Sequence, residues 1–123
     1  MSRDSRELAI RAARAAVAKQ GEAATILDVR DLITITDYFV IVSGGSDRQV
    51  KTIADEVIRS LKEIGVRPAR VEGESAARWL LLDFVDFVVH VFEHQEREFY
   101  RLENLWIDAP LVEWDERAEV SSG

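Results

Sequence analysis

Hydrophobic and polar positions along this chain switch repeatedly between helical and strand spacing. Residues 3–20 are rich in alanine, and Leu8 is followed by alanines at helical spacing, which predicts a helix with a thin apolar stripe. The segment 24–29 is short and rich in strand-forming residues, and 38–43 is an almost unbroken apolar run. These two segments predict strands, the second of them buried on both faces.

The clearest predicted helix begins after Ser46. Ser46 and Gln49 match the S-x-x-Q capping box, in which a side chain satisfies the first amides of a helix. Gly65 is placed to end the helix just beyond its last turn. Apolar residues lie between these ends at spacings of three and four. They are Val50, Ile53, Val57, Ile58, Leu61 and Ile64.

Three further strands are predicted in the second half of the chain. Residues 68–72 form the first, and a loop at 73–77 follows. Residues 78–83 and 87–92 are both apolar and close together, so we expect them to pair through a tight connection.

The connection within this hairpin decides which side chains face one another. A two-residue turn at Phe84–Val85 places Trp79 opposite His90 and leaves both faces of the hairpin largely apolar. Helices can cover one face. We expect part of the other face, around Trp79, Leu81, His90 and Phe92, to remain open to a partner. The alternative is that Trp79 and Phe92 are ordinary core residues.

A last helix is predicted to begin near 93–95, and Pro110 prevents its continuation. Its apolar side carries Phe99, Leu102, Leu105 and Trp106. The order helix, two strands, helix, three strands, helix predicts a single α/β domain, with a mixed β-sheet of about five strands packed with helices. We expect this domain at residues 1–114 and a polar, frayed tail at 115–123.

Composition narrows the compartment and the kind of site. The chain has 123 residues, 47% of them apolar, which is enough to bury one core. It contains no cysteine, which excludes disulfides and thiolate metal sites. No apolar run approaches the roughly 20 residues that span a bilayer, and the first residues lack the apolar segment of a signal peptide. We therefore expect a cytoplasmic protein that does not bind membranes.

Charge is distributed unevenly along the chain. Residues 1–20 carry a net charge of +3, residues 21–92 of −4 and residues 93–123 of −6, within an overall charge of −7. Nucleic-acid affinity depends mainly on neutralising phosphates, so we expect no direct binding of nucleic acid. A basic protein partner suits this charge better, because attraction between opposite charges speeds the encounter.

His90, Glu93 and His94 spell H-x-x-E-H, the inverted zincin motif. A zinc site needs both histidines within about 2 Å of the metal, on one helical face. His90 instead lies in a β-branched run, where residues four apart are separated by about 13 Å. We therefore expect no metal and no cofactor. His90 is either a half-buried strand residue or a contact for a partner.

Gly44, Gly45 and Ser46 form a turn from a strand into a helix, which can present backbone N–H groups to an anion. A similar loop occurs in nucleotidyltransferases, whose metals require a D-x-D pair on the adjacent strand. The nearest pair here, Asp83 and Asp86, is spaced D-x-x-D, and there is no Walker lysine. A small nucleotide-binding or nucleotidyltransferase-like enzyme is the alternative function.

Several motifs occur together in a fixed order. They are SGGSDRQVKTIADEV at 43–57, VEGE at 71–74 and WLLLDFVDFVVHVFEHQEREFYRLENLW at 79–106. With these motifs the chain resembles the Iojap-type ribosomal silencing factors, the RsfS family, from about residue 28 to residue 110. The resemblance implies a nucleotidyltransferase-like fold that acts without a cofactor and without enzymatic activity.

The resemblance also implies a partner. Silencing factors bind large-subunit ribosomal protein uL14 and sterically block joining of the small subunit, which represses translation under nutrient limitation; some relatives form homodimers. Relatives often have tyrosine where this chain has Phe99, so a hydroxyl is missing there. Carried over motif by motif, the partner-binding residues are Trp79, Leu80, His90, Phe92, Arg97, Phe99 and Tyr100.

Overall fold

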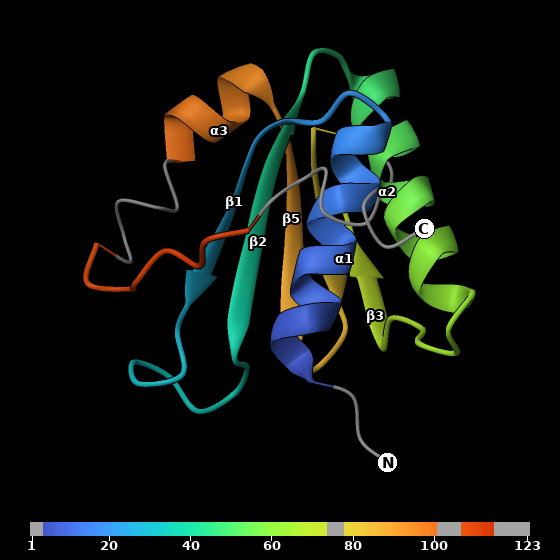
Figure 1. Cartoon of the computed structure of the whole chain (residues 1–123). Coiled ribbons are helices and arrows are strands. Elements are labelled where there is room, and N and C mark those ends of the chain that lie inside the picture. Colours follow the sequence, from blue (N-terminus) through green and yellow to red (C-terminus); the bar gives the residue numbers. More distant parts are fainter. Residues whose placement is uncertain (1–3, 74–77, 101–106, 115–123) are drawn as a thin grey trace.

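A five-stranded mixed sheet carries two helices against one of its faces (Figure 1). The computed structural model describes residues 4–73, 78–100 and 107–114, without the side chains of 98–100. The elements are α1 (Ser5–Ala18), β1 (Glu22–Asp28), β2 (Tyr38–Gly44), α2 (Asp47–Lys62), β3 (Arg70–Glu72), β4 (Trp79–Asp83), β5 (Phe87–Glu93) and α3 (His94–Tyr100). This confirms the predicted α/β class and the predicted order of elements. The tail at 115–123 lies outside the described residues.

The strands are ordered β1-β2-β5-β4-β3, so β2 and β5 occupy the interior of the sheet. β2 and β5 run parallel, and every other neighbouring pair is antiparallel. The end of the described chain returns to the free side of β1, where Asp28 N–H donates to the Pro110 carbonyl at 2.8 Å and Val112 N–H donates to the Ile26 carbonyl at 2.8 Å. This segment covers part of an edge that would otherwise expose unpaired backbone groups.

The main core lies between the sheet and helices α1 and α2. Alternate residues of β2 and β5, such as Val40 and Val89, point toward the helices and are fully buried. α2 contributes larger side chains, including Ile53 and Val57. α1 contributes mainly alanines, which allow its backbone to lie close to the sheet and to α2. The buried alanines are Ala9, Ala12, Ala13, Ala15 and Ala16.

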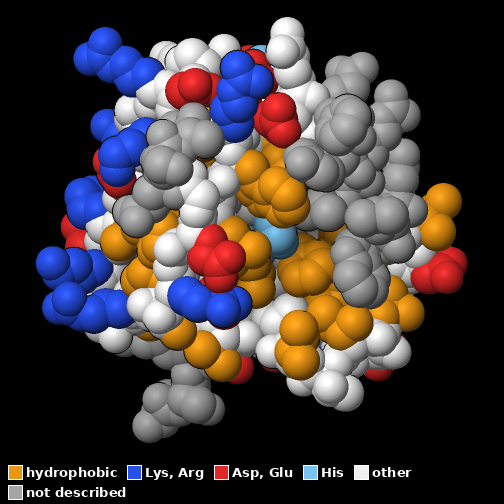
Figure 2. Space-filling view, turned by 180° about the vertical axis from the view of Figure 1, so that it is seen from behind, with side chains coloured by type: hydrophobic (Ala, Val, Ile, Leu, Met, Phe, Trp, Pro, Cys, Tyr) orange, Lys and Arg blue, Asp and Glu red, His pale blue; other side chains and the backbone are white. Residues whose placement is uncertain are grey.

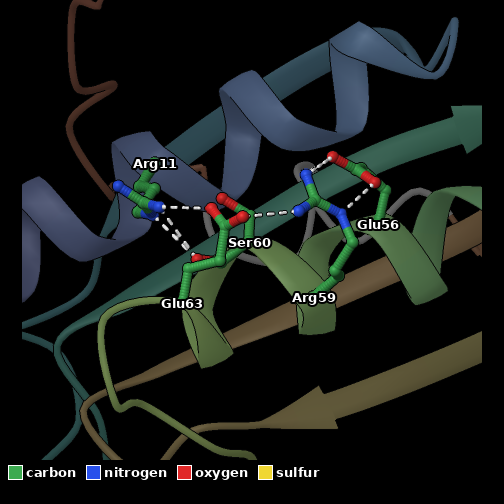
Figure 3. A network of polar contacts seen from close by, with 5 residues as sticks. All are labelled: Arg11, Glu56, Arg59, Ser60 and Glu63. Carbon is green, nitrogen blue, oxygen red and sulfur yellow. Dashed lines mark hydrogen bonds and ion pairs between the residues drawn. The ribbon is translucent and has the colours of Figure 1, made fainter.

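A polar clamp joins the outer sides of α1 and α2 (Figure 3). The Arg11 guanidinium donates to the Ser60 carbonyl through Nε at 3.1 Å and Nη2 at 2.9 Å. Ser60 lies in the last turn of α2, where carbonyls lack partners within the helix and favour a positive charge. Arg59 binds both Glu56 and Glu63, which hold its side chain along the same helix. The clamp aligns two helices whose apolar contact consists largely of small side chains.

Both predicted ends of α2 are confirmed. The Ser46 hydroxyl accepts the Gln49 N–H at 3.1 Å, as an N-cap does. The Gln49 side chain, however, donates to the Lys19 carbonyl instead of completing the capping box. Gly65 has φ of +81°, and the amides of Gly65 and Val66 donate to Lys62 and Leu61, the hydrogen bonds of a Schellman motif.

The predicted register of the β4–β5 hairpin is wrong. Trp79 pairs with Phe92 rather than with His90, and Leu81 is opposite His90. The turn lies at Val85–Asp86, one residue later than predicted, with Val85 at φ of +76° and the Phe84 N–H donating to the Phe87 carbonyl at 3.0 Å. The resulting shift of two residues leaves every side chain on its expected face, because side chains alternate with a period of two.

We predict that Ser46→Ala lowers the free energy of unfolding by about 1 kcal/mol, because the Gln49 amide loses its acceptor at the start of α2. Urea unfolding of the purified protein measures this change. Ser46→Asn is the matched control, since asparagine is an equally good N-cap and should stay close to the wild type. Equal stability of the wild type and Ser46→Ala would show that the cap contributes nothing.

Candidate partner-binding surface

The face of the sheet turned away from α1 and α2 is rich in aromatic and apolar side chains. Strand pairing places them together: Phe39 pairs with Val88, and Leu81 with His90. Figure 2 shows hydrophobic side chains gathered around a histidine on this side of the molecule, with charged side chains close beside them as well as toward the margins. We call this surface the aromatic face, and its members are Phe39, Trp79, Leu81, Val88, His90 and Phe92.

The middle of the aromatic face is a cluster of rings around His90. The Trp79 indole Nε1–H donates to His90 Nδ1 at 3.2 Å. The Trp79 and Phe92 rings are stacked, with centroids 4.8 Å apart. Phe39 meets His90 in a T-shaped arrangement at 5.3 Å. These contacts hold the Trp79 and His90 rings in one orientation, as a preformed binding surface requires.

His90 lies on the face of the sheet that α1 and α2 do not cover. Its neighbours nevertheless bury it. The residue is 6% exposed, and this burial lowers its pKa from 6.5 to about 4. Desolvation disfavours the charged imidazolium, so the ring is neutral at pH 7. The side chain therefore adds polarity to the aromatic face without adding charge.

A second, smaller core supports one side of the aromatic face. It consists of Leu27, Val29, Ile41, Phe92 and Ala109, with Ile33, Phe39 and Trp79 packed against it. Phe92 is only 1% exposed, so the expectation that it stays open to a partner is wrong and it is a core residue, stacked against the Trp79 ring. Trp79, Phe39, Leu81 and Val88 are each half-buried, so these four offer apolar surface to solvent.

The structure brings three of the predicted site residues together and separates one. Trp79, His90 and Phe92 lie side by side on the aromatic face. Leu80 points to the opposite side of β4, into the main core, and is 3% exposed. Phe99 and Tyr100 belong to α3, but their side chains lie outside the described residues.

Arg97 fastens α3 to the first two strands. Its Nη1 donates to the Ala23 carbonyl at 2.7 Å and to Ser43 Oγ at 3.0 Å, and its Nη2 donates to Thr25 Oγ1 at 3.3 Å. Ala23 lies in a bulge of β1, with φ of +53°. Bulges re-aim backbone groups, and this one supplies the carbonyl that Arg97 binds. Arg97 thus positions α3 relative to the sheet.

Sequence reasoning missed Phe39 and Val88 as members of this surface. Both were recognised as strand residues, but the parallel pairing of β2 with β5 that brings them beside His90 was not predicted. Nor did any signal indicate the β1 bulge or the acceptors of Arg97. A usable clue was that 38–43 is apolar on both faces, since such a strand needs cover on both sides.

The described residues show little that could hold a metal or phosphate. They contain no group of three or more His, Asp and Glu placed to bind a metal ion. His94 Nε2 lies 2.8 Å from Glu22 Oε1, so this histidine is in contact with β1. A side chain at Gly44 would meet Val50 at 3.1 Å, so this glycine permits close packing of β2 against α2.

Among the residues that the structure describes, no helix is long and apolar enough to cross a membrane.

The Asp83 and Asp86 pair lies far from the Gly44–Ser46 turn. Gly44 is paired with Glu93 at one end of β5, whereas the two aspartates flank the turn at its other end, roughly 20 Å away along the strand. Asp83 is also occupied locally: its Oδ1 accepts the Val85 N–H at 2.8 Å. These carboxylates are therefore not placed to serve a nucleotide at the turn.

An α/β domain with helices on one sheet face and half-buried aromatic residues on the other is the form of a small binding domain. The chain matches the family model described as "Ribosomal silencing factor during starvation" over residues 2–123. The chain therefore belongs to this family, and the predicted resemblance is confirmed.

Individual relatives agree with the family match. The chain is 44% identical over 104 residues to the ribosomal silencing factor RsfS of Bacillus subtilis, covering 85% of this chain and 88% of the relative. It is 44% identical over 95 residues to RsfS of Halalkalibacterium halodurans, covering 77% and 81%. A crystal structure of a protein from Chromobacterium violaceum has a TM-score of 0.82 at 34% identity, covering 85% of this chain and 87% of that one.

Membership decides between the two functions kept open by the sequence. The relatives are named as ribosomal silencing factors, which are regulatory proteins rather than enzymes. As a member of this family the chain is a regulatory protein rather than an enzyme, and the nucleotide-handling alternative built on the Gly44–Ser46 turn is not supported.

We predict that His90 makes the protein less stable in mild acid. Its pKa is about 4 in the folded chain and 6.5 without burial, so the unfolded state binds the proton more readily. The free energy of unfolding should therefore be constant above pH 6.5 and fall as the pH is lowered to 4, by on the order of 3 kcal/mol. Urea unfolding at several pH values measures this slope.

His90→Gln is the control for this slope, because it removes the titrating ring. Asp28 and Glu56, whose pKa values are lowered by hydrogen bonds from arginine, titrate alike in both proteins. The stability difference between wild type and variant should change steadily between pH 6.5 and 4. A difference that does not depend on pH would exclude His90 as the source.

Proposed function

We propose that the aromatic face binds ribosomal protein uL14 on the large subunit, and that the bound domain sterically prevents the small subunit from joining. The observation that carries this proposal is the half-buried set Phe39, Trp79, Leu81 and Val88 on a sheet face without α1 or α2. Tryptophan is enriched among residues that dominate binding energy, and apolar patches of this kind mark interaction sites. By preventing the subunits from joining, the bound domain would repress translation under nutrient limitation.

The predicted contact residues take different parts in this proposal. Trp79 is the central anchor, with His90 beside it and Phe92 beneath it. Phe99 and Tyr100 extend the contact from α3, which Arg97 holds against β1 and β2. Leu80 contributes from the main core, by fixing β4 rather than by touching the partner.

Charge supports a basic protein as the partner. The chain carries a net charge of −7, and an acidic surface attracts a basic protein but is repelled by phosphates. We propose that contact with uL14 is sufficient for binding, in the cytoplasm, without contact to ribosomal RNA or a cofactor. Steric exclusion requires a surface and bulk, and no reactive group.

A homodimer through the aromatic face would use the same apolar surface as the ribosome. The two associations would then exclude one another, because each needs Trp79 and its neighbours to be buried. We propose that dimerisation, where it occurs, competes with silencing.

We predict that Trp79→Ala weakens binding to isolated large subunits by about 2 kcal/mol or more, because truncating a hot-spot residue loses desolvated contact. Tyr100→Ala should have a similar effect from α3. Co-sedimentation measures the affinity, and a subunit-joining assay measures silencing. Circular dichroism establishes that each variant remains folded.

Ile64→Ala is the matched control for Trp79→Ala. Ile64 is likewise half-buried and apolar, but it packs against the main core on the helix side. Its truncation should leave binding unchanged. Folded Trp79→Ala protein that binds large subunits like the wild type would contradict the proposed surface.

We predict that salt acts mainly on the association rate. Charges around an apolar contact steer the encounter, and screening weakens this effect as ionic strength rises. Raising salt from roughly 0.05 to 0.3 M should slow association with purified uL14 several-fold, while dissociation changes less. Binding that requires ribosomal RNA and is lost with the isolated protein would contradict the proposed contact.

A further inference from the structure

The hydrogen bond between Trp79 and His90 determines which imidazole nitrogen carries the proton. An indole N–H can only donate, and Trp79 Nε1 lies 3.2 Å from His90 Nδ1. Nδ1 must therefore present its lone pair. A neutral imidazole has one proton, so in this ring it resides on Nε2.

The other ring nitrogen of His90, Nε2, is left for a different partner. Among the described residues, no hydrogen bond satisfies this nitrogen. The ring's only hydrogen bond is the one that Trp79 donates to Nδ1. The described chain nevertheless contains just one fully buried side-chain polar atom without a partner, which is Thr36 Oγ1. Nε2 is not such an atom, and His90 keeps 6% of its surface exposed.

The ring cannot readily turn to hide this donor. Phe39 meets it edge-on at 5.3 Å, and the Phe92 ring lies nearly parallel to it with centroids 6.1 Å apart. Reversing the ring would place another atom against the Trp79 N–H and lose that hydrogen bond. The Nε2–H group is consequently held in place before any partner arrives.

We propose that His90 Nε2–H is a fixed hydrogen-bond donor at the centre of the aromatic face, and that it binds a carbonyl oxygen of the protein partner. This inference rests on the proposed function and adds the chemistry that the partner must present at this point. The surrounding apolar residues exclude water when the surfaces meet, so a donor left without an acceptor would be costly. His90 thereby sets the register of the partner and discriminates against apolar surfaces that lack an acceptor.

The first experiment tests the donor in the free protein. Nitrogen-15 NMR of the imidazole distinguishes a protonated nitrogen from an unprotonated one. At pH 7 we expect His90 to be a single tautomer with the proton on Nε2, and Trp79→Phe, which removes the indole N–H, to release the ring into a mixture. Protonation of Nδ1 in the wild type would overturn the proposal whether or not the protein binds ribosomes.

The second experiment tests the donor in the complex, with isolated large subunits as the probe. His90→Phe keeps an aromatic ring but has no donor, and we expect about tenfold weaker binding. His90→Gln carries an amide N–H near the position of Nε2 and should bind within about threefold of the wild type. His94→Phe, the same change at the other histidine, is the matched control and should bind normally.

The outcomes separate this inference from the proposed function. If the wild type does not bind large subunits at all, the proposed function fails while the NMR result stands. If the wild type and folded His90→Phe bind equally, the function is retained and the donor role is wrong. Loss of binding by both His90→Phe and His90→Gln, with both folded, would also overturn it, since the ring itself would then be what the partner requires.

Discussion

The parallel pairing of β2 with β5 is the constraint on which the rest of the structure depends. Both strands are apolar on both sides, and they lie in the interior of the sheet. A strand of this kind must be kept from water on its two faces. The described helices α1 and α2 meet this need on one face only (Figure 1).

The other face is covered unevenly, and this unevenness creates the surface. Around Ile41 and Phe92 the second core closes the sheet, with Ala109 and Leu27 as part of the cover. Toward β4 the cover thins, and Trp79 and Leu81 remain half-buried. An apolar face that the described residues close only in part is the kind of surface that marks interaction sites. His90, in the middle of this face, is 6% exposed, and its burial lowers its pKa.

Much of the fold could be predicted because its signals are local. The Ser46 cap, the Gly65 terminus and the apolar spacing between them depend on residues within one helix. The face on which each strand residue lies could also be predicted. Side chains alternate between the two faces, so an error of two residues in register leaves each on the same face. The register itself could not be predicted, because a turn that begins at Val85 needs positive φ, and valine rarely adopts that conformation.

The parts of the site that escaped prediction all depend on long-range contacts. Phe39 joins His90 only through the β2–β5 pairing, which closes a long stretch of chain. Arg97 illustrates the same limit: the family resemblance implied that it binds the partner, yet its guanidinium binds acceptors from β1 and β2. Those acceptors, a bulged carbonyl and two hydroxyls, have no signature of their own in the sequence.

The anchoring of Arg97 also connects the aromatic face to the edge of the sheet. A guanidinium can bind several acceptors in fixed directions, whereas a lysine ammonium would not reproduce this geometry. The placement of α3 thus depends on the β1 bulge at Ala23, on the far side of β2 from β5. β1 supplies no half-buried aromatic side chain to the aromatic face. It acts through this contact, which places α3.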